Sequence, residues 1–306
     1  MEIEQLIQSI QTQKKKVESD IHSAEGMVRL QQVAQEYKGE YELISSDEIQ
    51  KELATRPKKQ MHIMGVPALD ELLGGLREQM LISLAAHSGH GKTAMSMWIT
   101  EKYKQLNPIM IALEQSAEEL IEQRTENGQF VPHFYTNKTY AARVKPDWIE
   151  QRIIEGIAKF NSRLVVIDHL GYTDCDKKYD RDPEPLRIER KMQDLKNIAK
   201  RWNVIIIVLV HIVQLDESIP PSLVSLKGSS AIRQESDKVI LLWRKNKMKG
   251  KVRTYFNETL FSLQKNRWSG KNGNLGLWFD QDTGEYTVEN SWVAQMEKLA
   301  EQEEDF

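Results

Sequence analysis

A run of eight residues combines residue types and spacing that suit phosphate chemistry. The run is Ala86-His87-Ser88-Gly89-His90-Gly91-Lys92-Thr93. It fits the Walker A pattern Gly-x-x-x-x-Gly-Lys-Thr, except that alanine replaces the first glycine. An apolar run precedes it and a helix is expected to follow, so backbone N–H groups and the positive helix end would converge on phosphates. A chance match in a strand-to-helix turn is the alternative.

We expect all eight residues of this loop to contact a nucleotide, with separate roles for four of them. Lys92 would neutralise the β and γ phosphates, and Thr93 would hold Mg²⁺ through its hydroxyl. Gly89 and Gly91 would adopt positive φ, which glycine does without steric cost. The loop therefore predicts two ligands, ATP and Mg²⁺.

Two acidic residues follow apolar runs that predict strands. Asp168 closes the run 164–167 and is the Walker B candidate, whose carboxylate would orient water on the magnesium. Glu114 follows the run 109–113 and is the candidate base for the attacking water. Because the carboxyl ends of parallel strands share one crevice, both would converge on the loop. The alternatives are a turn-capping aspartate and a glutamate that favours a first helical turn.

Five apolar runs predict the strands that would position these residues. They cover residues 81–85, 109–113, 164–167, 204–210 and 239–243. Runs of this length are typical of buried parallel strands. Because helical patterns lie between them, the alternation predicts an α/β fold with a parallel sheet.

Two of the helical patterns have clear signals. Residues 116–126 open with a Ser-x-x-Glu capping box. Residues 183–201 carry an apolar stripe, which consists of Leu186, Ile188, Met192, Leu195 and Ile198. Later runs, 258–264 and 275–288 with a turn at 282–284, predict added antiparallel strands.

Length and composition favour one large domain with an appendage. The chain has 306 residues, of which 40% are hydrophobic and 28% charged. No apolar run approaches the roughly 18 residues of a membrane span, and no targeting signal opens the sequence, so we expect a cytoplasmic protein without membrane contact. A single cysteine, Cys175, excludes an internal disulfide framework and a Cys-x-x-Cys zinc site. The net charge of −3 opposes a broadly basic surface but allows a few basic loops to enclose a nucleic-acid strand.

Three regions are predicted along the chain. Residues 1–57 would form an N-terminal helical appendage, in which a capping box at 45–48 opens a linker helix through Leu53. Residues 58–290 would form the α/β core, and residues 291–306 a C-terminal helix with an acidic tail.

Four segments carry a resemblance to a known family. They are Gly65–Leu76, Leu113–Leu120, Asp168-His169-Leu170 and Gly228–Arg244. With the Walker A loop they resemble the DnaB-like replicative helicases over residues 62 to 288, and most of all the branch of phage primase-helicases and mitochondrial Twinkle. The resemblance implies a RecA-like P-loop ATPase core. It also implies a homo-oligomer, a hexameric ring, that hydrolyses ATP at subunit interfaces and moves 5′ to 3′ on single-stranded DNA.

The resemblance implies three further catalytic residues. His211 would sense the γ-phosphate and couple it to the DNA loops; a histidine satisfied at a strand end is the alternative. Lys265 and Arg267 match a Lys-x-Arg pair that reaches into the neighbouring subunit's ATP, with Arg267 as the arginine finger. A delocalised cation supplied in trans stabilises charge on the transferring phosphoryl group.

The remaining implied residues contact the base or the DNA. Arg244 and Phe279 occupy places that sandwich adenine, although Phe279 requires a one-residue gap and ordinary core is its alternative. Lys227 ends the predicted second DNA loop, residues 216–227, and Gly228 begins the segment after it; a solvated lysine is the alternative for Lys227. The charged segment 174–187 is a candidate for the other central loop.

The ends of the chain predict partners. Residues 1–60 match neither a primase nor a globular N-terminal domain; they would form a small collar or dock a primase, polymerase or loader. The tail Glu301–Phe306 resembles acidic tails that touch a polymerase, with a solvated end as the alternative. Two other functions stay open: a RadA- or KaiC-like recombination or signalling ATPase, and a non-unwinding helicase loader or adaptor. Lys265 and Arg267 oppose the first, and Glu114 opposes the second.

Overall fold

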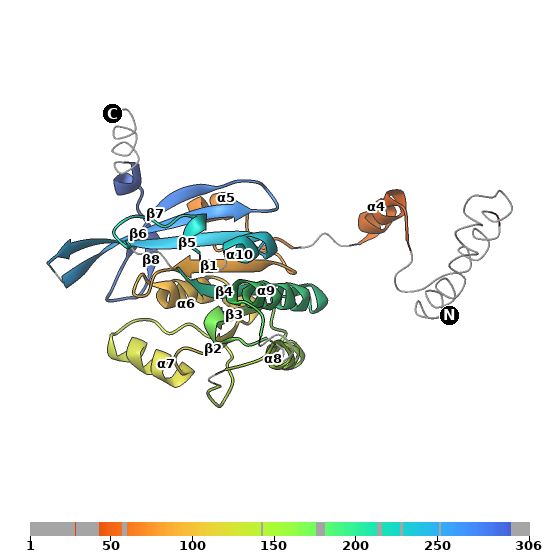
Figure 1. Ribbon diagram of the computed structural model, residues 1–306, viewed down its shortest axis with the longest axis horizontal. Helices are drawn as coiled ribbons and strands as arrows, with labels where there is room; N and C mark the ends of the chain where they lie inside the picture. The colour runs from red at the N-terminus through yellow and green to blue at the C-terminus, as the bar shows by residue number, and fades with distance from the viewer. Residues whose placement is uncertain are drawn as a thin grey trace. The chain divides into compact units, whose positions relative to one another are not determined.

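Figure 1 shows a computed structural model of the protein, which describes most residues from position 43 to position 294. The described residues are 28, 43–56, 60–141, 143–175, 181–212, 216–226, 229–250 and 252–294. Two compact units divide the chain, Met1–Lys58 and Lys59–Phe306. Lys227, Gly228, the acidic tail and most of the appendage lie outside the described residues.

The first unit contains α4 (Ser46–Thr55), and the predicted capping box begins it. Ser45 accepts a hydrogen bond from the backbone N–H of Glu48, and the Glu48 carboxylate accepts one from the backbone N–H of Ser45. The helix ends two residues beyond the predicted Leu53. None of its residues is buried.

The second unit is built on one eight-stranded sheet with the order β2-β3-β4-β1-β5-β6-β7-β8. The strands are β1 (Leu81–Ala86), β2 (Ile109–Ala112), β3 (Leu164–Asp168), β4 (Ile205–His211), β5 (Lys238–Lys249), β6 (Val252–Asn266), β7 (Gly273–Phe279) and β8 (Tyr286–Val288). The first five are parallel, and β6 to β8 add antiparallel pairs. Both predictions, the parallel core and the antiparallel extension, are confirmed.

Alternate residues of each parallel strand enter two separate cores, because successive side chains point to opposite faces of a sheet. On β1, Ile82 and Leu84 pack with Trp98 and other side chains of α6 (Lys92–Lys102). Leu81 and Ala85 face the other core. Helices α8 (Pro146–Phe160), α9 (Glu184–Arg201) and α10 (Ser229–Glu235) cover that face, and α5 (Pro67–Leu73) covers the first. The sheet is therefore buried on both sides, as the apolar runs predict.

Helix α9 confirms one predicted helix and corrects its stripe. Met192, Leu195 and Ile198 are buried, but Leu186 is 37% exposed. Six residues separate Leu186 from Met192, and at 3.6 residues per turn they lie about 120° apart around the helix. Leu186 therefore does not belong to the buried stripe. The other predicted helix, α7 (Ala117–Glu126), begins with the expected capping box of Ser116 and Glu119.

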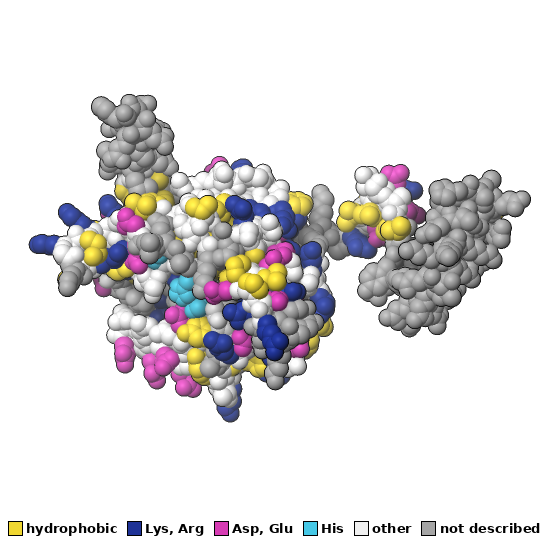
Figure 2. Space-filling view, in the orientation of Figure 1, with side chains coloured by type: hydrophobic (Ala, Val, Ile, Leu, Met, Phe, Trp, Pro, Cys, Tyr) yellow, Lys and Arg dark blue, Asp and Glu magenta, His cyan; other side chains and the backbone are white. Residues whose placement is uncertain are grey.

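The β5–β6 hairpin is longer than the predicted strands at 239–243 and 258–264. Its outer part pairs Asn246 with Tyr255 and Lys249 with Val252. It projects from the sheet in Figure 1, and Lys and Arg side chains gather at its end in Figure 2. Backbone pairing continues where the side chains no longer enter a core, so hydrophobic pattern alone cannot find this part. Among the described residues, no helix is long and apolar enough to cross a membrane.

Candidate nucleotide site

The Walker A loop connects β1 directly to α6. Gly89 and Gly91 have φ of +77° and +84°, the predicted positive values. The Lys92 ammonium donates hydrogen bonds to the carbonyl oxygens of Ala86 and His87, both at 3.0 Å. Burial lowers the pKa of Lys92 to about 8, and the carboxylates of Asp168 and Glu114 oppose that shift. The loop thus encloses one cation, while Ser88 at its tip is exposed.

Asp168 ends β3 beside this loop. The Thr93 hydroxyl donates a hydrogen bond of 3.0 Å to Asp168 Oδ2. Asp168 is 4% exposed, and its Oδ1 has no hydrogen-bond partner within the described part of the chain. Desolvation raises the pKa of Asp168 to about 6, against the lowering effect of the Thr93 hydrogen bond. A buried carboxylate oxygen without a partner, next to a hydroxyl, fits the oxygen ligands and bound waters that Mg²⁺ prefers.

Glu114 lies beside Asp168 because the backbone fixes it there. The N–H groups of Leu113 and Glu114 both donate to the Asp168 carbonyl oxygen, at 2.7 and 3.1 Å. The Glu114 side chain is 40% exposed, and its Oε2 lies 3.9 Å from Nε2 of His211. His211 Nδ1 lies 3.2 Å from Lys92 Nζ. The structure therefore brings together five residues that the sequence predicts at one site, at the carboxyl end of the parallel strands.

His169 is a member of this site to which the sequence assigns no role. Its Nε2 lies 3.7 Å from Glu114 Oε2, and its ring meets that of His211 at 4.1 Å between centroids, at 87°. Burial, followed by the charges of His211 and Lys92, lowers the pKa of His169 to about 4. Only the position directly after the Walker B residue could have pointed to it.

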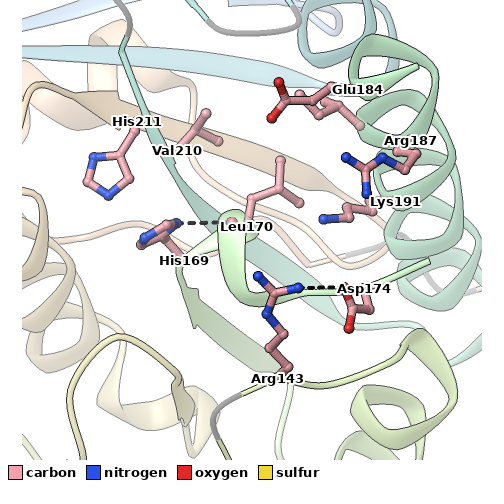
Figure 3. Close-up of a pocket in the computed structure, with 11 residues that line it drawn as sticks. Arg143, His169, Leu170, Asp174, Glu184, Arg187, Lys191, Val210 and His211 are labelled. Carbon is pink, nitrogen blue, oxygen red and sulfur yellow. Dashed lines mark hydrogen bonds and ion pairs between the residues drawn. The ribbon is translucent and has the colours of Figure 1, made fainter. Parts of the chain in front are cut away.

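A cavity of about 260 Å³, called the basic cavity below, is lined by the two histidines, by three cations and by two acidic residues, Asp174 and Glu184. Figure 3 shows His169 and His211 on one side and Arg187 and Lys191 of α9 on the other. Arg143 lies below and forms an ion pair of 3.5 Å with Asp174. In Figure 2, histidine side chains reach the surface on this face of the unit, with Lys and Arg side chains nearby.

Arg244 and Phe279 lie close together on the other side of the Walker A loop. The Arg244 guanidinium carbon is 5.6 Å from the centroid of Phe279 and 5.7 Å from that of Tyr255. Phe279 is only 8% exposed and belongs to the core, so its described packing is that of a core residue. The half-buried Tyr255, which the sequence does not single out, lies nearer the loop: a Cβ added at Gly89 would be 3.3 Å from its hydroxyl.

Lys265 and Arg267 lie at the opposite edge of the sheet. Asn266 between them pairs with Lys238 at the start of β5, which in turn pairs with Ile82 near the start of β1. At about 3.3 Å per residue, the start of β1 is roughly 16 Å from the loop that follows its end. Neither cation contacts the Walker A loop of its own chain.

The same two cations cap the end of α10. Lys265 donates to the carbonyl oxygen of Arg233, and Arg267 donates to that of Gln234. Arg267 also lies 3.6 Å from the Asp237 carboxylate and is half exposed. Cations are favourable at a helix C-terminus, where carbonyl groups have no partner in the helix.

Residues 216–226 are the described part of the predicted DNA loop. Through Glu217 they contact the Walker A loop and the β5–β6 hairpin. Its carboxylate lies 2.9 Å from Arg253 Nη1 on β6 and 3.6 Å from Nε2 of His90 in the Walker A loop. His90 is fully buried, and its Nδ1 accepts a hydrogen bond of 3.0 Å from the Arg244 backbone N–H. Glu217 therefore connects three segments that are distant in sequence.

The parallel sheet, with a glycine-rich loop after β1 and acids after β2 and β3, defines a RecA-like P-loop protein. Residues 63–139 and 141–288 match the family described as the DnaB-like helicase C terminal domain. The chain belongs to this family.

Curated relatives carry the same family name. The replicative DNA helicase DnaB of Mycoplasma genitalium is 26% identical over 264 residues, which cover 74% of this chain and 56% of that protein. The DnaB of Treponema pallidum is 23% identical over 224 residues, 63% of this chain and 51% of that protein. The chain thus spans about half the length of these relatives.

Two solved structures share the fold. One, described as an ATPase domain, has a TM-score of 0.65 at 20% identity, and the match covers 79% of this chain and 98% of that one. The other, a DnaB-like replicative helicase described with its interactions with primase, has a TM-score of 0.62 at 16% identity, with 92% and 75% covered. The roles of individual site residues stay predictions.

Proposed function

We propose that this chain is an ATP-dependent replicative DNA helicase that moves along single-stranded DNA as a ring, a hexamer, and hydrolyses ATP between subunits. One observation carries the proposal. The loop, Asp168 and Glu114 lie at one edge of the sheet, whereas Lys265 and Arg267 lie at the other. A second subunit must therefore supply the cations if both sets act on one nucleotide.

The residues of this chain suggest how hydrolysis would proceed. Lys92 would leave its loop carbonyls for the phosphates, and Gly89 and Gly91 would let backbone N–H groups approach them. Mg²⁺, held by Thr93 and through water by Asp168, would neutralise phosphate charge when bound. Glu114 would orient the attacking water and accept its proton. Arg267 of the adjacent subunit would stabilise charge on the transferring group.

DNA contact would involve the loops on the face of the basic cavity. Arg143, Arg187 and Lys191 supply positive charge there, close to His211, which would sense the γ-phosphate. A ring repeats such charges in each subunit, so the net charge of −3 does not oppose DNA binding. Lys227 and Gly228, outside the described residues, complete the proposed contact.

The other regions complete the proposal. Residues 58–290 would be the motor, and residues 1–57 and 291–306 would contact a primase, polymerase or loader. One similar structure is described with primase, which supports a contact of this kind. The setting would be the cytoplasm of a bacterial or phage-infected cell.

The test is the steady-state ATPase rate with and without single-stranded DNA. DNA should stimulate the wild type, and Glu114→Gln and Arg267→Ala should each reduce turnover at least about a hundredfold, in line with the contributions of a catalytic base and an arginine finger. A strand-displacement assay should then show unwinding. If DNA has no effect, or if Arg267→Ala hydrolyses ATP normally, a KaiC-like ATPase or a loader becomes the better assignment.

A further inference from the structure

His169 is placed where it can act on the proposed catalytic base. It follows Asp168, and Figure 3 shows it at the wall of the basic cavity, next to His211. Its Nε2 faces Glu114 Oε2 at 3.7 Å, and its side chain is only 12% exposed. The ring also meets the edge of Tyr172 at 4.8 Å. These contacts leave the imidazole little room to turn away.

The backbone fixes which nitrogen of His169 carries the proton. The N–H of Gly171 donates a hydrogen bond of 2.9 Å to Nδ1. A backbone N–H can only donate, so Nδ1 must hold a lone pair and the proton must be on Nε2. The protonated Nε2 therefore faces the Glu114 carboxylate at 3.7 Å, which is longer than a hydrogen bond, and a small rotation of the 40% exposed Glu114 side chain would bring the two groups into hydrogen-bond distance.

Glycine at position 171 is necessary for this arrangement. A Cβ added at Gly171 would lie 2.5 Å from Cε1 and 2.9 Å from Nδ1 of His169. Real Cβ atoms do not approach this closely, so any side chain there would displace the ring. A substitution at Gly171 is thus a separate way to move His169.

His211 has the same tautomer for a different reason. Its Nδ1 lies 3.2 Å from the Lys92 ammonium, which can only donate, so its Nε2 also carries the proton toward Glu114. Lys92 is the residue expected to move to the phosphates. The contact of His211 with Glu114 therefore depends on the nucleotide, whereas that of His169 depends only on its own backbone.

The same tautomers oppose a metal site at these residues. Ligand atoms of Glu114, His169 and His211 lie within 4.8 Å of one another. A metal would need the Nε2 lone pairs, and the hydrogen bond from Gly171 assigns that nitrogen of His169 a proton instead. The arrangement suits two N–H donors that face one carboxylate, at 3.7 and 3.9 Å.

We propose that His169 is a positioning residue that holds the Glu114 carboxylate through its Nε2–H, independently of bound nucleotide. The role rests on the proposed ATPase function. His211 and Lys92 then respond to the phosphates around a carboxylate whose orientation is already set. Loss of the His169 donor should slow the chemical step without weakening nucleotide binding.

The experiment compares kcat and KM for ATP, in the presence of single-stranded DNA, among variants of the full chain. His169→Ala should lower kcat at least tenfold and leave KM, and the affinity for a fluorescent ATP analogue, within about twofold. His169→Gln, whose side-chain amide can place an N–H near the lost one, should recover a large part of kcat. Gly171→Ala should reproduce the loss of kcat with His169 still present. His133→Ala, which removes an exposed histidine, is the control and should match the wild type.

Separate outcomes overturn the role and the function. The positioning role is overturned if His169→Ala has a normal kcat. It is also overturned if the loss appears in KM and His169→Gln does not rescue it. In either case, an inactive Glu114→Gln variant leaves the ATPase function intact. If His169→Ala does not fold, the other two variants decide. The role then requires that His169→Gln keeps a large part of the wild-type kcat and that Gly171→Ala loses it. A wild type without ATPase activity, or a Glu114→Gln variant with full activity, overturns the proposed function and the role with it.

Discussion

At the scale of single residues, burial keeps one side chain of the Walker A loop, His90, uncharged. His90 is fully buried, and burial, with the charge of His87 as the second cause, lowers its pKa to about 4. The charged or titratable groups that influence it are His87, Glu217 and Arg253. Its Nδ1 accepts the Arg244 N–H, which requires an unprotonated nitrogen. The neutral imidazole is therefore part of the native packing between the loop and β5.

Stability should consequently depend on pH through His90. The ordinary value of 6.5 applies to the unfolded chain, which binds one more proton than the folded chain between pH 4 and 6.5. The stabilisation from neutral His90 is thus complete above pH 6.5 and is lost as the pH falls to about 4. The wild type should lose on the order of 2 kcal/mol over this range from this residue.

Urea unfolding of wild type and His90→Asn at pH 7.5 and 4.5 measures this loss. Asparagine keeps an acceptor for the Arg244 N–H but does not titrate, so the variant should lose less stability on acidification. His133→Asn, a substitution of an exposed histidine, should follow the wild type. Equal losses in wild type and His90→Asn would contradict the assignment.

The sequence predicts the site residues that carry a local signal. Lys92 and Thr93 belong to a motif, and Asp168 and Glu114 each follow an apolar run, so strand topology alone brings them together. Tyr255 carries no such signal, and His169 has only its position directly after the Walker B residue. Tyr255 reaches the loop through hairpin pairing, and the tautomer of His169 depends on a single backbone N–H.

At the scale of elements, two connections join the two halves of the proposed active site to segments proposed to touch DNA. Helix α10 begins just after the proposed DNA loop and ends at carbonyls that bind Lys265 and Arg267. A shift of this short helix would therefore move the proposed finger pair. Glu217 forms the second connection, from residues 216–226 to His90 and the β5–β6 hairpin.

The ion pair between Glu217 and Arg253 of the β5–β6 hairpin should be stronger than an ordinary surface ion pair within that hairpin. Glu217 is 31% exposed and Arg253 is 23% exposed at a separation of 2.9 Å, so their attraction is only partly screened. A double-mutant cycle with Glu217→Gln and Arg253→Gln should give a coupling energy of about 1 kcal/mol. Glu217→Gln should also weaken nucleotide binding severalfold, because the hairpin side chain Tyr255 lies over Gly89.

Lys245 and Glu258 provide the matched control. They form an ion pair of 3.0 Å between β5 and β6, with Lys245 42% exposed and Glu258 19% exposed, so solvent screens the lysine end of the pair. Their cycle should give less than about 0.5 kcal/mol, and Glu258→Gln should bind nucleotide normally. Equal coupling in the two cycles, or normal nucleotide binding by Glu217→Gln, would show that Glu217 does not hold the hairpin over the loop.

Elements were predictable where burial leaves a pattern. The five parallel strands are apolar on both faces, and α7 has a capping box, so both appear in the sequence. The outer β5–β6 hairpin is held by backbone pairing between polar residues, which leaves no hydrophobic period. Helix α8 has a proline at its start and a buried face of Ile149 and Ile153, which are the usual start signal and spacing of an amphipathic helix.

At the scale of the whole molecule, the two edges of the sheet carry the two halves of the proposed active site. Glu114 and Lys92 lie at the carboxyl ends of the parallel strands, and Arg267 lies near their amino ends. One chain thus offers an acceptor edge and a donor edge, and a closed ring of identical chains would pair each acceptor with a neighbour's donor. A mixing experiment can test this arrangement.

Glu114→Gln and Arg267→Ala should each be inactive alone and active when mixed. In a mixed ring, the intact acceptor edge of an Arg267→Ala subunit can meet the intact donor edge of a Glu114→Gln subunit, and random assembly makes about a quarter of the interfaces complete. The ATPase rate of the mixture should therefore rise well above that of either variant. Glu114→Gln mixed with the doubly substituted chain is the control, because no complete interface can form there. Native mass spectrometry should confirm that subunits exchange in the first mixture. If they exchange and the mixture is still as inactive as the control, Arg267 does not act on the neighbouring subunit's nucleotide. The separation of the two edges then does not reflect an active site shared between subunits.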